Sequence, residues 1–91
     1  MLERRFTLAG RSLVPIVQGG MGVGISAHRL AGAVAREGGV GTIASIDLRH
    51  HHADLAAATE KSHDKEAINA ANLVALDREI RAARERSQGN G

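Results

Sequence analysis

A short apolar run gives way to four glycines within six residues in the segment Pro15-Ile16-Val17-Gln18-Gly19-Gly20-Met21-Gly22-Val23-Gly24-Ile25-Ser26. Apolar residues followed by glycines and a serine predict a strand, a tight turn and the start of a helix, with Ser26 as the helix N-cap. Because glycine has no side chain, such a turn lets bare backbone approach a flat or phosphorylated ligand. The segment therefore predicts a turn that contacts a ligand.

The residues around this turn predict one strand-helix-strand unit. A first buried strand is expected over residues 13–18, and a helix over residues 27–37 is expected to end at Gly38 and Gly39. A second strand is expected over residues 40–46, which are rich in β-branched side chains and show no alternation, as in a strand covered on both faces. The handedness rule makes the two strands parallel and the crossover right-handed.

The second half of the chain predicts a polar loop and then a long helix. Residues 47–63 are polar around Arg49-His50-His51-His52 and are expected to form a loop or lid, with a helical turn at residues 54–59. A helical pattern runs from Asp64 to Arg86. Its buried stripe is expected to consist of Asn69, Asn72, Leu73, Leu76, Ile80 and Ala83. Either asparagine could instead cap a neighbouring loop through its side chain.

The composition indicates part of a larger α/β domain. Ninety-one residues allow at most one domain, and a domain of this size buries only about 60% of the surface that its unfolded chain exposes. Phe6 is the one aromatic residue, and much of the apolar content is alanine, which buries little area. The order β-α-β-loop-α also leaves both edges of a two-stranded parallel sheet open. We therefore expect a β-α-β-loop-α fragment.

Charge and hydropathy exclude several classes of protein. Twelve basic and ten acidic residues give a net charge of +2 without a basic cluster, so we expect no nucleic-acid partner. No run approaches the ~18 apolar residues of a membrane span, so we expect no membrane association and a cytoplasmic location. The absence of cysteine excludes disulfides and a thiolate nucleophile.

The glycine turn matches neither of the common phosphate-binding motifs. Gly20, Gly22 and Gly24 place the third glycine one residue too early for the dinucleotide fingerprint. The lysine and hydroxyl residue that end a triphosphate-binding loop are missing as well. A turn remains in which Gln18 can hydrogen-bond to a ring edge and Met21 can rest against an aromatic face. A tight turn without a ligand is the alternative interpretation.

Residues 15–22 together with residues 30–43 resemble the amino-terminal part of the nitronate monooxygenase family, formerly called 2-nitropropane dioxygenases. The resemblance implies that residues 1–91 are an amino-terminal segment of a single FMN-binding TIM (β/α)8 barrel domain and form its first two units. It implies FMN contacts from Gln18, Gly19, Gly20, Met21, Gly22 and Ser45. It also implies oxidation of a small nitronate-like substrate with O₂, in which this chain alone would be inactive. Flavin-dependent enoyl-acyl-carrier-protein reductases open similarly and remain an alternative.

The resemblance assigns no catalytic residue here, because the family's catalytic histidine and its phosphate-binding loops lie further along the chain. The histidines carry a separate alternative, a small non-catalytic module that binds a metal or a partner. Adjacent imidazoles at residues 50–52 should point in different directions, and they lack the i,i+4 spacing of a helical zinc pair. Asp54 is close in sequence and His63 lies eleven residues beyond His52, so a metal site is conceivable, but no metal ligand is assigned. His28 is expected to be neutral and solvent-facing, because the helix N-terminus disfavours a charged imidazole.

Overall fold

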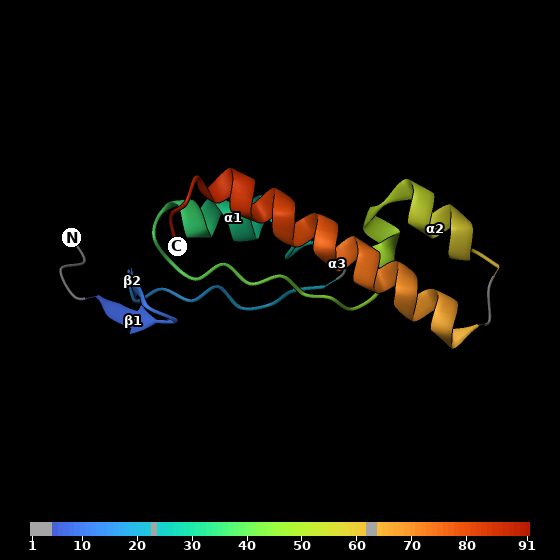
Figure 1. Ribbon diagram of the computed structural model, residues 1–91, viewed down its shortest axis with the longest axis horizontal. Helices are drawn as coiled ribbons and strands as arrows, with labels where there is room; N and C mark the ends of the chain where they lie inside the picture. Colours follow the sequence, from blue (N-terminus) through green and yellow to red (C-terminus); the bar gives the residue numbers. More distant parts are fainter. Residues whose placement is uncertain (1–4, 23, 62–63) are drawn as a thin grey trace.

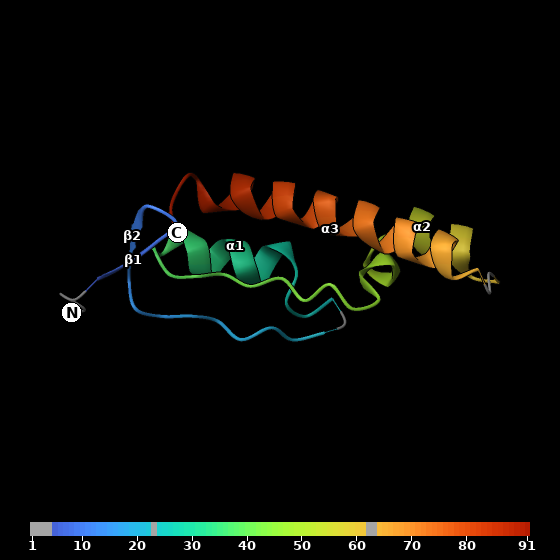
Figure 2. The same ribbon diagram turned by 60° about the horizontal axis from the view of Figure 1, so that its bottom comes forward.

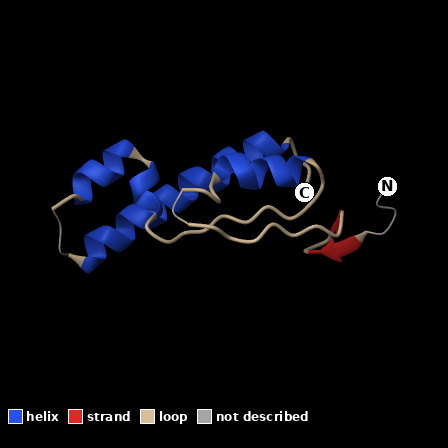
Figure 3. Ribbon diagram, turned by 180° about the vertical axis from the view of Figure 1, so that it is seen from behind, coloured by secondary structure: helices blue, strands red, loops and turns tan. Residues whose placement is uncertain are grey.

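The computed structural model describes residues 5–22, 24–61 and 64–91, which form a small mixed α/β structure (Figure 1). Its elements are β1 (Phe6–Leu8), β2 (Arg11–Leu13), α1 (His28–Arg36), the short 3₁₀ helix η1 (Leu48–His51), α2 (Ala53–Thr59) and α3 (Lys65–Ser87). The molecule is elongated, with extents of 51 × 21 × 19 Å. The helices form one layer, and two long extended segments run along it (Figure 3).

The residues before the first predicted strand form a hairpin. β1 and β2 pair antiparallel, with Phe6 opposite Leu13. Ala9 and Gly10 make the turn, and both have positive φ, 51° and 78°. A two-residue turn of this kind matches the twist of the strands that it joins. Leu13 therefore ends a hairpin strand, whereas the sequence pattern predicted that it begins the first parallel strand.

The prediction of regular strands over residues 13–18 and 40–46 is wrong, although the two segments do run parallel. Among the described residues, they share one parallel bridge, between Val17 and Val40. Main-chain hydrogen bonds of 2.9 Å run from Val14 N to Gly38 O, from Val40 N to Ile16 O and from Gln18 N to Val40 O. The ladder stays short because Ile16 N bonds back to Val14 O at 2.7 Å, and not to the partner segment, and because no third described strand supports either edge.

The helix of the unit is close to its predicted length. α1 ends before Gly38, whose φ of 90° is the left-handed conformation that a glycine stop requires. The prediction that Ser26 caps this helix is wrong. Ala27 occupies the N-cap position without a side-chain cap, and the Ser26 hydroxyl donates to the carbonyl oxygen of Thr42.

The predicted polar loop contains two short helices. Leu48 opens η1 and is fully buried, and its burial holds this segment against the rest of the molecule. α2 then begins at Ala53. Asp54 lies in its first turn, where the helix dipole stabilises an acidic side chain. The prediction of a loop is therefore wrong for residues 48–51, whereas the helical turn predicted at residues 54–59 is confirmed by α2. His63 lies outside the described residues.

α3 begins and ends close to its predicted limits, but it buries a different face. The Asp64 side chain accepts a hydrogen bond from Glu66 N and caps the helix. The buried residues of α3 are Ala71, Ala75, Glu79 and Ser87. Leu73 of the predicted stripe is 66% exposed. α1 lies close alongside the last turns of α3 (Figure 2), where a β-carbon on Gly32 would lie 2.8 Å from Arg86 Cβ. η1 packs on the earlier part of α3, where its Arg49 bonds to Asn72.

Candidate functional site

The glycine segment consists of the described residues from Gly19 to Gly24. It follows Gln18, where the parallel pairing with residues 38–40 ends, and it lies along residues 42–46. A β-carbon on Gly20 would lie 3.6 Å from Thr42 Cγ2, and one on Gly22 would lie 2.8 Å from Ile46 Cγ2. The glycines therefore follow residues 42–46 at close range. This arrangement brings the predicted cofactor residues at positions 18–22 alongside the segment that contains Ser45.

The Gln18 side chain joins the two extended segments. Its Oε1 accepts a hydrogen bond from Thr42 N at 3.1 Å, and its Nε2 donates to Thr42 O at 3.1 Å and to Gly19 O at 2.8 Å. Nε2 also lies within hydrogen-bond distance of the Ser26 hydroxyl. These bonds occupy the planar amide and fix the chain where the glycines begin. Contact between Gln18 and a flavin ring stays a prediction.

The glycine backbone is open to solvent and could accommodate a flat ring. Gly19, Gly20, Gly22 and Ser45 are exposed, and Met21 is 44% exposed. A β-carbon on Gly19 would have no atom within 4 Å. The space over Gly19 is therefore available to a ligand, and the neighbouring backbone of Gly20 is exposed as well. These residues fit the expectation of a ring held against bare backbone.

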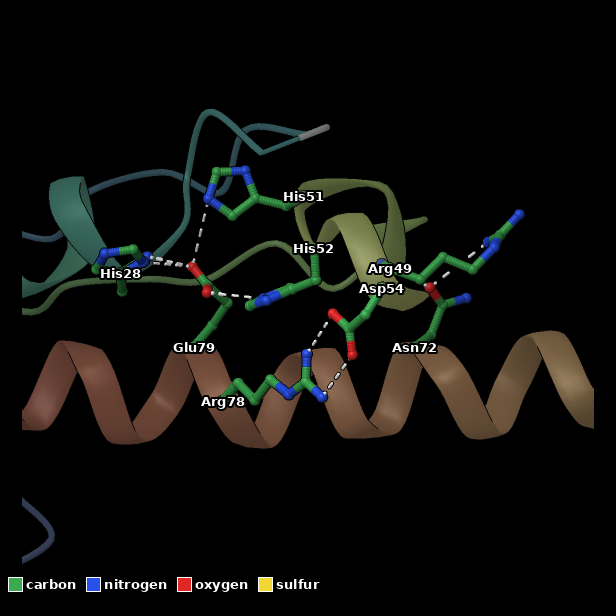
Figure 4. A network of polar contacts seen from close by, with 8 residues as sticks. All are labelled: His28, Arg49, His51, His52, Asp54, Asn72, Arg78 and Glu79. Carbon is green, nitrogen blue, oxygen red and sulfur yellow. Dashed lines mark hydrogen bonds and ion pairs between the residues drawn. The ribbon is translucent and has the colours of Figure 1, made fainter. Parts of the chain in front are cut away.

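Three imidazoles surround a buried carboxylate (Figure 4), and one of them, His51, lies beside Gly24. The Glu79 side chain is 2% exposed. Its Oε1 accepts from the main-chain N–H of His28 at 2.9 Å and lies 2.8 Å from His28 Nδ1. Oε2 lies 3.0 Å from His52 Nε2, and His51 Nε2 lies 3.8 Å from Oε1. We call these four residues, His28, His51, His52 and Glu79, the histidine-glutamate cluster.

The cluster keeps the Glu79 carboxyl ionised. Burial by itself raises the pKa of Glu79, but the main-chain and ring hydrogen bonds of His28, together with the charges of His28 and His51, lower this pKa on balance. The prediction that His28 faces solvent is wrong, because its ring contacts the buried carboxylate and is only 27% exposed. Glu79 places negative charge at the N-terminus of α1, where the helix dipole favours it.

Two neighbouring histidines reach the same carboxylate, contrary to the expectation that adjacent imidazoles diverge. The chain leaves η1 at His52, whose φ of −120° and ψ of 115° are extended. This bend brings the rings of His51 and His52 into an edge-on contact, with centroids 5.7 Å apart, beside Glu79. His50 is exposed and lies outside the cluster.

Sequence reasoning missed Glu79 because it assigned the buried face of α3 to the larger side chains. The available signal was the spacing of Ala71, Ala75 and Glu79, which are four residues apart and share one helix face.

Asn72 on the same helix caps the neighbouring segment through its side chain, which was one of the two interpretations of this residue from the sequence. Its Oδ1 accepts from Arg49 N at 3.0 Å.

The profile of one protein family, described as nitronate monooxygenase, matches residues 7–84. The matched residues include both the glycine segment and the histidine-glutamate cluster. The match makes the chain part of a family of oxidoreductases that act on small molecules. The chain belongs to the nitronate monooxygenase family.

Searches of the curated proteins and of the solved structures give no match. Among the helices that the structure describes, none combines the length and the apolar character needed to cross a membrane.

Proposed function

We propose that the chain supplies one wall of the FMN site of a nitronate monooxygenase-like oxidoreductase. The observation that carries the proposal is the exposed backbone of Gly19, Gly20 and Gly22, which lies along residues 42–46. Membership of the family supports the choice of FMN. The parallel direction of the two extended segments, with α1 between them in sequence, supports the proposal that they form the first two units of a (β/α)8 barrel.

The residues of the wall take different parts in this proposal. Gly20 and Gly22 leave space for the isoalloxazine ring, Met21 provides a polarizable contact, and Ser45 contributes from the neighbouring segment. Gln18 positions the turn through its bonds to Thr42. When bound, FMN supplies the redox chemistry by which an alkyl nitronate is oxidised with O₂. The active sites of such barrels lie at the carboxyl ends of their strands, where this glycine segment follows Gln18.

Substitution of Gly20 tests the proposed wall. Gly20→Val should abolish flavin retention, because a β-branched side chain occupies the space that the ring requires. The test joins residues 1–91 to the remaining units of a nitronate monooxygenase barrel and measures flavin absorbance per polypeptide after purification. We expect about one FMN per chain for the unsubstituted protein and nearly none for Gly20→Val. Oxygen consumption with an alkyl nitronate should fall in parallel.

Ala57→Val is the matched control, because it adds a similar side chain at an exposed position of α2. It should leave the flavin content unchanged. A β-carbon at residue 20 makes only ordinary contacts at 3.6 and 4.0 Å, so Gly20→Ala should also fold. Stoichiometric flavin in Gly20→Val would show that the ring lies elsewhere.

A further inference from the structure

We propose that the histidine-glutamate cluster is a zinc site, in which His28 Nδ1, His51 Nε2 and one Glu79 oxygen bind the ion. The three residues come from α1, η1 and α3, so a bound ion would join three elements that are distant in sequence. This site is separate from the proposed flavin wall, and it does not depend on flavin binding.

The distances within the cluster suit a small divalent ion. The three ligand atoms lie within 4.8 Å of one another. Zinc bonds of about 2.0–2.1 Å in tetrahedral geometry place neighbouring ligand atoms about 3.3 Å apart. The observed separations from Glu79 Oε1 lie on either side of this value, at 2.8 Å for His28 Nδ1 and 3.8 Å for His51 Nε2. Both separations are within roughly half an ångström of the zinc value, and His28 Nδ1 and His51 Nε2 lie no more than 4.8 Å apart.

The donor set matches the chemistry of zinc. Two imidazole nitrogens and one carboxylate oxygen are ligands that zinc takes in proteins, and three protein ligands leave a fourth position for water. The His51 side chain is 35% exposed, so solvent can reach the cluster on that side. For zinc to bind, His28 must carry its proton on Nε2, which leaves the Nδ1 lone pair free.

The surroundings hold the ligands in place, as metal sites require. Oε2 of Glu79 lies 3.0 Å from His52 Nε2, a buried nitrogen that makes no hydrogen bond in the described structure. When zinc binds Oε1, Oε2 keeps its place beside the His52 ring. Gly24 lies under the other edge of the His51 ring, where a β-carbon would be 2.9 Å from Nδ1. His51 therefore presents Nε2 to Glu79.

A metal titration tests the site with the 91-residue chain, prepared without an affinity tag and treated with a chelator. Co²⁺ serves as the probe because its visible absorption reports coordination, and Zn²⁺ is then added in competition. We expect one Co²⁺ per chain, displaced by Zn²⁺. His51→Asn should weaken binding by about tenfold or more, because it removes a ligand from a partly exposed position.

His50→Asn is the matched control, since His50 is the exposed neighbour on the same 3₁₀ helix. It should bind Co²⁺ as the unsubstituted chain does. Equal loss in both variants would assign binding to the run of histidines alone and would overturn the proposal, as would an unchanged affinity in His51→Asn. Far-UV circular dichroism shows whether each variant keeps its helices.

One measurement needs no variant. Zn²⁺ added to the chain labelled with ¹⁵N in histidine should shift the Nδ1 resonance of His28 and the Nε2 resonance of His51. Shifts confined to residues 50–52 would contradict the proposed ligands.

Discussion

At the scale of single residues, Gln18 determines how the two extended segments meet. Its amide satisfies both the N–H and the C=O of Thr42, which have no strand partner at that position. Buried or half-buried main-chain groups require such partners, and leaving one unpaired costs about 1–3 kcal/mol. Gln18 therefore has a structural role, in addition to its proposed role at the flavin site.

The ion pair of Asp54 and Arg78 gives a pH-dependent prediction. The Arg78 guanidinium donates to both carboxylate oxygens of Asp54, at 2.8 and 2.9 Å. The side-chain hydrogen bond from Arg78 is the main cause that lowers the pKa of Asp54 below its ordinary value of 3.8. Because the folded-state pKa is the lower one, the stabilisation is fully present above pH 3.8 and is lost as the pH falls through the folded-state value.

We expect Arg78→Ala to return the Asp54 pKa towards 3.8, as measured by NMR titration of its carboxyl carbon. Arg81→Ala is the control, because Arg81 pairs with Asp77 on an exposed part of the same helix. It should leave the Asp54 titration unchanged. An Asp54 pKa that stays the same in Arg78→Ala would contradict the ion pair.

At the scale of the elements, the packing of α1 on α3 depends on small residues. Gly32 on α1 faces the last turns of α3, and Ala71 and Ala75 lie buried on the same face of α3 as Glu79. Close approach of the helices in turn lets Glu79 reach the N-terminus of α1. The larger apolar side chains of α3, such as Leu73, remain exposed because they project away from this contact.

Gly32→Val should destabilise the fold by about 1–3 kcal/mol, because the added side chain overpacks the contact between the helices. A β-carbon there would lie 2.8 Å from Arg86 Cβ and 3.1 Å from Ala83 O. Urea unfolding followed by helical circular dichroism measures the effect. Ala33→Val, on the exposed side of α1, should lose only helix propensity, at most about 0.7 kcal/mol. Equal losses at the two positions would contradict this packing.

At the scale of the whole molecule, the helices cover one side of the extended segments and leave apolar residues exposed. Val17 and Ile46 are each 65% exposed, and Ile25 is 61% exposed. Large exposed apolar side chains that gather on one side of a protein mark a surface for contact with other groups. It agrees with the proposed place of these segments among the strands of a larger barrel.

The elongated shape itself can be measured. The radius of gyration is 15.0 Å, whereas a compact domain of this length has a value of about 12 Å. Small-angle X-ray scattering from a dilution series should give a value near 15.0 Å at infinite dilution. A value near that of a compact domain would mean that the extended segments fold back on the helices.

Local signals in the sequence predicted the features that depend on neighbouring residues. The end of α1 at Gly38 and the start of α3 near Asp64 both follow from backbone preferences within a few residues. The direction of the extended segments also followed, because a strand-helix-strand order permits few arrangements. Regular strands did not form there, since pairing requires neighbours that a local pattern does not supply.

The sequence alone established the family, through the glycine segment and the residues around Gly38, and it placed five of the six candidate flavin contacts next to one another at residues 18–22, with Ser45 on a separate segment. Tertiary structure decided which face of α3 is buried, where the Ser26 hydroxyl donates, and that His28, His51 and His52 surround Glu79. His28 and Glu79 are 51 positions apart. Contacts between residues so distant depend on how closely two helices can approach, and that distance is set by packing rather than by any local preference.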